Sequence, residues 1–73
     1  MIELTLSALL STVAVDFCKH RNDGKEVLPA VLLAYSAAND KYGGENVRKV
    51  ISKSSNIEVQ AIAQVVSKCP DKL

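Results

Sequence analysis

Apolar residues recur at helical spacing over most of the chain. In the first third they fall three and four positions apart, at Leu6, Leu9, Leu10, Val13 and Phe17. That spacing places them on one face of a helix and predicts a helix over about 5–19. Residues 2–7 also alternate between apolar and polar types, a spacing typical of a strand. The first turn of this element therefore stays open between helix and strand.

A second apolar stripe lies between the polar turn clusters 20–25 and 39–44. Its members are Leu28, Val31, Leu32, Tyr35 and Ala38. Pro29 fits the first turn of a helix, where a missing amide hydrogen costs nothing, and Gly43 is a suitable end. Leu33 and Ala37 widen the apolar face, so we expect this helix to be the central and most buried element.

Two shorter helices are predicted in the last third. The first covers about 45–53, with Val47, Val50 and Ile51 facing inward. The second begins at a capping box formed by Ser55 and Glu58, in which each side chain accepts a hydrogen bond from a first-turn amide. Its inward stripe is Val59, Ile62, Val65, Val66 and Cys69. Pro70 ends it.

The predicted fold is all-α, a compact bundle of three to four short helices forming a single helical domain over 1–73. The alternative is an α+β fold with an N-terminal strand or a hairpin. Residues 13–19 and 26–33 would pair across the Asp23-Gly24 turn in that hairpin. Pro29 argues against it, because proline removes a hydrogen-bond donor from the second strand.

The length of the apolar stretches and the charge beside them indicate in which cellular compartment the protein works. The longest apolar stretch, 4–15, is too short to cross a bilayer, which requires about 20 residues. Glu3 stands where a signal peptide carries positive charge. These features predict a cytoplasmic protein. In that compartment Cys18 and Cys69 are expected to be free buried thiols, because a disulfide requires an oxidising environment. Whether they are ever oxidised stays open.

Catalytic and metal chemistry find no support in the sequence. His20 is the single histidine, and Cys18, two residues away, does not share a helix face with it. We interpret His20 as a solvated residue at a helix end. The two cysteines and this histidine lack the close-spaced pairs of a zinc site, and no glycine-rich phosphate loop is present. We therefore expect no enzyme activity, no cofactor and no bound metal.

Binding of another macromolecule is the function that this chain predicts. Nine Lys and Arg against eight Asp and Glu lack the basic excess of a dedicated nucleic-acid binder. Positive charge gathers locally, since four cations against Glu45 leave about +3 over 41–53. The predicted partner-binding residues are these four cations, Lys41, Arg48, Lys49 and Lys53.

The predicted function is a small non-catalytic regulatory protein that occludes or bridges a partner, in the first place a protein. Inhibitors, adaptors and antitoxins of phages and mobile elements are of this kind. A homodimer is also compatible with the apolar content. The alternative is a weak helix-turn-helix DNA-binding regulator over 45–68, in which Gln60 and Gln64 would contact adenine. Glu58 opposes it near phosphates, and Lys68 is the single cation of the reading helix.

Overall fold

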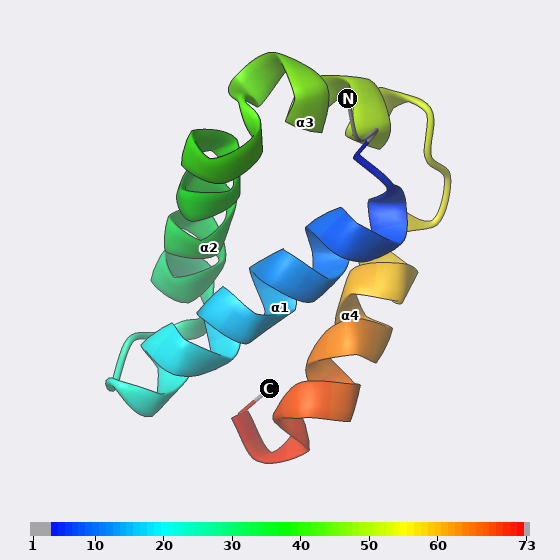
Figure 1. Cartoon of the computed structure of the whole chain (residues 1–73). Coiled ribbons are helices and arrows are strands. Elements are labelled where there is room, and N and C mark those ends of the chain that lie inside the picture. The colour runs from blue at the N-terminus through cyan, green and yellow to red at the C-terminus, as the bar shows by residue number, and fades with distance from the viewer. Residues whose placement is uncertain (1–3, 73) are drawn as a thin grey trace.

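The computed structural model describes residues 4–72 (Figure 1). It contains four α-helices and a final 3-10 turn: α1 (Leu6–Asn22), α2 (Val27–Tyr42), α3 (Gly44–Ser52), α4 (Ile57–Lys68) and η1 (Pro70–Lys72). No residue in the described range forms a strand. The predicted all-α bundle is thus confirmed, and the predicted hairpin is wrong, because both of its arms are helical. The strand alternative at 2–7 falls partly on residues 1–3, outside the described range; Leu4 and Thr5 are irregular and precede α1.

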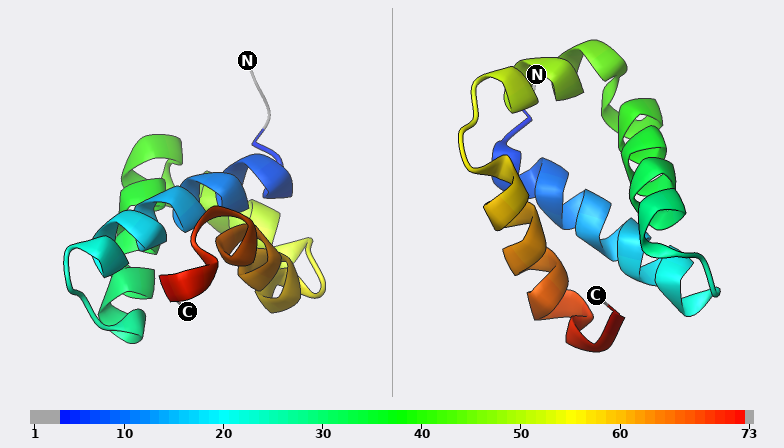
Figure 2. Two further views of the ribbon diagram at one scale, coloured as in Figure 1. Left: turned by 90° about the horizontal axis from the view of Figure 1, so that it is seen from below. Right: turned by 180° about the vertical axis from the view of Figure 1, so that it is seen from behind.

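The helix α1 is the centre of the bundle. It runs obliquely between α2 and α4, as Figure 1 and the rear view in Figure 2 show. Its buried residues are Leu9, Leu10, Val13, Ala14, Phe17 and Cys18. Four of the five residues of the predicted stripe are therefore confirmed as buried, and the fifth, Leu6, is half-buried. The expectation that the second helix would be the most buried is wrong. The Thr5 hydroxyl oxygen begins α1 by accepting a hydrogen bond from the Ala8 amide at 3.1 Å.

The contact between α1 and α2 is built on alanine. Ala30, Ala34 and Ala38 are all fully buried and repeat every fourth residue. Such a line of small side chains lets the two helices approach closely, so the larger leucines of α2 lie away from α1. Leu28 and Leu32 are accordingly exposed, so these two members of the predicted inward stripe are wrong. Its other members are confirmed, since Ala38 is buried and Val31 and Tyr35 pack against the core. The predicted end of α2 is confirmed: Gly43 has φ 88°, a left-handed region that favours glycine.

The start of α4 also differs from the prediction. Asn56, with left-handed φ 56°, precedes the helix, and no side chain caps it. The predicted capping box of Ser55 and Glu58 is thus wrong. The helix begins at Ile57, so Ser55 lies one position too early to reach the amides of the first turn. The Ser55 carbonyl instead accepts a hydrogen bond from the Gln60 side-chain amide at 3.5 Å.

The two cysteines form a disulfide. Cys18 of α1 and Cys69, directly after α4, are bonded with their Cα atoms 5.9 Å apart, a usual separation for a disulfide. The prediction of free thiols is therefore wrong. Both residues belong to apolar helix faces that pack on each other, and this packing brings them together across 51 positions of sequence.

The disulfide fixes which face of α4 meets α1. Val65 and Cys69 are buried, while Val59, Ile62 and Val66 are exposed by 67%, 53% and 45%. These three valine and isoleucine residues were predicted to face inward, and that part of the stripe is wrong. Spacing alone placed all five residues on one broad face, but α1 covers its Cys69 side only.

Candidate partner-binding groove

A groove of about 930 Å³ runs where the beginning of α1 meets the end of α2 and the outer side of α3. Its walls combine apolar and positively charged side chains. The lining residues are Leu4, Leu6, Ala8, Lys41, Tyr42, Asn46, Lys49, Val50, Lys53 and Ser54. None of these residues, all within the described range, is acidic.

Tyr42 fixes the junction of α2 with α1 at the base of the groove. Its hydroxyl lies 2.8 Å from the Thr12 hydroxyl oxygen, a hydrogen bond between side chains of the two helices. The Asn46 side-chain amide donates to the Tyr42 carbonyl at 2.8 Å, which ties the first turn of α3 to the same point. The Lys41 ammonium lies 5.3 Å from the centre of the Tyr42 ring, within the range of a cation–π contact. Several independent contacts therefore hold this end of the groove in shape.

The helix α3 supplies the opposite wall. Lys49, Val50 and Lys53 occupy neighbouring turns on the side that faces the groove, so a positive rim borders an apolar surface. At the C-terminal end of α3, the Ser54 hydroxyl donates a hydrogen bond to the Val50 carbonyl at 2.6 Å. Val47, on the inner side of α3, is buried and anchors the helix on the core.

Three of the four predicted partner-binding residues come together here. Lys41, Lys49 and Lys53 line the groove, but Arg48 does not. Consecutive helical residues point about 100° apart, so the neighbours Arg48 and Lys49 diverge. The Arg48 guanidinium lies instead over the start of α3, 3.9 Å from the place that a Cβ on Gly44 would occupy.

The charge of the groove remains positive in the folded protein. Glu45 lies 3.8 Å from the Lys49 ammonium, yet both side chains are well exposed. An exposed pair at this spacing contributes little and leaves the lysine free to meet another anion. Sequence reasoning found the cations through their local excess. It missed the apolar floor from Leu4, Leu6 and Ala8, because their own spacing assigned them to the first helix or strand and not to a surface beside α3.

The other predicted chemistry lies away from the groove. His20, in the last turn of α1, is partly exposed and lies 3.5 Å from the Asp16 carboxylate, one turn earlier. Within residues 4–72 no three His, Cys, Asp or Glu residues are placed to hold a metal ion. Nor does any helix in this range have the length and apolar character needed to span a membrane. Comparison with models of protein families, with curated proteins and with solved structures finds no match for this chain.

Proposed function

We propose that this chain is a small non-catalytic regulatory protein that binds another protein through the groove between α1 and α3, and so occludes or bridges that partner. The observation that carries the proposal is the convergence of Lys41, Lys49 and Lys53 on an apolar channel in which no lining residue of the described range 4–72 is acidic. Apolar surface provides affinity when it is covered, and a cationic rim selects and steers an anionic partner.

The chemistry of the groove defines the partner segment. It should carry apolar side chains for the floor, beside Leu4, Leu6 and Val50, and carboxylates for the rim. An amphipathic helix with one acidic edge has both, because residues three and four apart share a face. We therefore propose an acidic amphipathic segment of a partner protein as the ligand.

The neighbours Arg48 and Lys49 provide a matched test. Both are exposed cations of α3, but only Lys49 lines the groove. The probe is a fluorescent, helix-forming peptide with one leucine face and one glutamate edge, titrated at low salt and followed by anisotropy. We expect Lys49→Glu to weaken binding by about tenfold and Arg48→Glu by less than about twofold, because rim charges act mainly over short, poorly screened distances.

Equal losses in the two variants would contradict the proposal, since the effect would then follow net charge and not the groove. Undiminished binding in Lys49→Glu would contradict it as well. A photo-crosslinking residue at Asn46, in the groove wall, tests the native partner. The same residue at Gln60, exposed on α4, is the control and should not capture that partner.

The packing of the helices argues against DNA binding by 45–68. A helix-turn-helix requires its two helices to pack on each other, whereas α3 packs mainly on α2 and α4 packs on α1. The outer face of α4 also presents Val59, Ile62 and Val66 in place of cations. Absence of salt-sensitive binding to duplex DNA is the expected result.

The disulfide bears on the compartment in which the protein works. Disulfides persist in oxidising compartments and are rare in a reducing cytosol. We propose that the oxidised form is the working form, in place of the cytoplasmic dithiol predicted from sequence. Alkylation of the native protein directly on cell lysis tests this: Cys18 and Cys69 should be protected until a reductant is added.

A further inference from the structure

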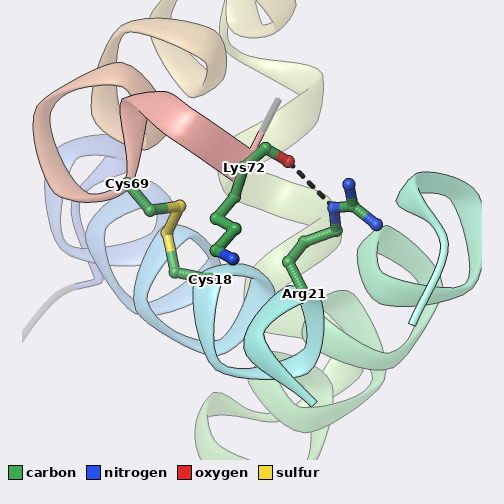
Figure 3. Close-up of a disulfide and its surroundings, with 4 residues drawn as sticks. All are labelled: Cys18, Arg21, Cys69 and Lys72. Carbon is green, nitrogen blue, oxygen red and sulfur yellow. Dashed lines mark hydrogen bonds between the residues drawn. A yellow bond between two sulfur atoms is a disulfide. The ribbon is translucent and has the colours of Figure 1, made fainter. Parts of the chain in front are cut away.

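A second, smaller depression lies beside the disulfide and shares no lining residue with the groove. It has a volume of about 530 Å³ and is open to solvent. Its lining residues are Val15, Cys18, Lys19, Asn22, Asp23 and Lys68. Both cysteines are buried, with 8% and 7% of their surfaces exposed, and Cys18 is the one that contributes to the wall of the depression. Figure 3 shows the bond between the two cysteines, with the C-terminal turn folded over it.

The charged side chains around this depression attract an anion. Lys19 and Lys68 both line it, and Asp23 is the one acidic residue of the lining, so one positive charge is left over. The nucleophile that opens a disulfide is a thiolate, which is itself an anion. In a small thiol that also carries a fixed negative group, the lysines attract both the thiolate and that group.

We propose that Cys18–Cys69 is a thiol-exchange site that reacts, in the folded protein, with small anionic thiols. The thiolate enters the depression and attacks the Cys18 sulfur. A new sulfur–sulfur bond forms there as the bond to Cys69 breaks, and the electron pair leaves on the Cys69 sulfur. A second thiolate attacks the sulfur of the first and releases an external disulfide. Two external thiols are thereby oxidised, and both cysteines, after taking up protons, are reduced.

The consequence falls on α4 and the C-terminal turn. Besides the disulfide, the Arg21 guanidinium holds η1 by donating to the Lys72 carbonyl at 2.8 Å (Figure 3). The helix itself buries Val65 alone among its own residues. Exchange at Cys18 therefore removes the covalent tie of α4 to α1 and leaves the helix held by its packing around Val65.

Reduction kinetics of the full-length oxidised protein test the proposal. The probes are mercaptoethanesulfonate, mercaptoethanol and cysteamine, which are respectively anionic, neutral and cationic beside the thiol. Each rate is divided by the rate of the same thiolate with an unstructured, neutral disulfide peptide. We expect rates that rise linearly with thiol concentration, and a preference of about threefold for the anionic over the neutral thiol at low salt, as one net charge at about 6 Å provides.

Two double variants locate the effect. Lys19→Gln with Lys68→Gln leaves Asp23 alone and should reverse the preference, a total change of about tenfold. Lys25→Gln with Arg48→Gln removes the same charge from exposed positions outside the depression and should leave the preference within about twofold.

Three results would overturn the proposal. The first is a reduction rate that stops rising with thiol concentration and reaches the same plateau for all three thiols. Unfolding, and not attack by the thiol, would then limit the reduction rate. The second is a linear rate without a preference for the anionic thiol. The third is an equal effect of the two double variants. Circular dichroism before and after each reaction confirms that the oxidised starting protein is folded.

Discussion

The two neighbours of α1 are held by different means. Against α2, the contact consists of alanines that are completely buried, Ala30, Ala34 and Ala38. Against α4, one valine is buried, and a covalent bond from Cys18 to Cys69 makes the connection. The large aliphatic side chains of α4 that could have joined a core lie in solvent, with Val59 exposed by 67%.

This difference separates two ways of stabilising a small helical protein. Close packing lowers the free energy of the folded state through many short contacts, and it is lost when side-chain volume changes. A disulfide acts mainly by reducing the entropy of the unfolded chain and tolerates a loosely packed neighbour. Both neighbours of α1 nevertheless keep large aliphatic side chains outward, Leu28 and Leu32 on α2 and Val59 and Ile62 on α4. The difference between them therefore lies in how they are attached and not in the apolar surface that they expose.

Removing the disulfide is the harshest test of this comparison. The bond closes a loop of 51 positions, so the variant Cys18→Ala with Cys69→Ala should lose about 4 kcal/mol of unfolding free energy. Urea denaturation of the oxidised protein and of the variant measures the loss.

Hydrogen exchange in that variant should be unequal along the chain. Amides of α4 should exchange much faster than those of α1 and α2, whose alanine contact is untouched. Uniform acceleration over all three helices would contradict the comparison, because α4 would then share the core of the other two.

Overpacking the alanine contact is the next largest effect. Ala34 is fully buried, so Ala34→Leu should cost about 1–3 kcal/mol as the larger side chain forces α1 and α2 apart. Leu32→Ala, two positions away but 62% exposed, is the matched control and should cost less than about 0.5 kcal/mol. Thermal melts distinguish them. A larger loss of stability in Leu32→Ala than in Ala34→Leu would mean that α2 packs on α1 through its leucines, as the sequence spacing predicted.

Helical spacing predicted the elements better than their orientation. The stripe of α1 was correct because its large apolar residues and its buried face coincide, from Leu9 to Phe17. In α2 an alanine line and a leucine line run side by side, and spacing cannot tell which one meets a neighbour. The larger side chains were the natural choice, yet the smaller ones allow the closer approach.

The cationic part of the groove was predictable, and its apolar part was not. A local excess of charge is visible in the sequence, and it points to Lys41, Lys49 and Lys53, which line the groove, but equally to Arg48, which does not. Leu4 and Leu6 lie far from α3 in sequence, and only the packing of α1 against α3 brings them to the same surface. The disulfide was missed for another reason: the sequence was interpreted as that of a cytoplasmic protein, and in a reducing compartment thiols stay free.

The start of α4 provides a smaller test, at the end of the helix away from the disulfide. Ser55→Ala should change stability by less than about 0.3 kcal/mol, because Ser55 caps no amide in the structure. Asn56→Gly should raise it by about 0.5 kcal/mol, since glycine adopts the left-handed conformation of Asn56 without a steric penalty. Chemical denaturation measures both. A clear loss in Ser55→Ala would bring back the capping box.

The smallest expected effect is a loss of unfolding free energy at alkaline pH that arises from one residue of α2. Tyr35 packs against the core, and desolvation by burial raises the pKa of its hydroxyl above the ordinary value of about 10.0. A raised pKa in the folded state means that the neutral phenol is favoured there. Its contribution to stability is therefore complete below pH 10 and is lost as the pH rises through the folded-state pKa.

Tyr35→Phe cannot ionise at this position, so its unfolding free energy should fall less steeply above pH 10 than that of the wild type. Urea denaturation at several alkaline pH values, compared between the two proteins, isolates this group from the lysines that both contain. Parallel curves would show that Tyr35 is solvated in the folded state, and the α1–α2 side would then be packed less completely around this residue than around its alanines.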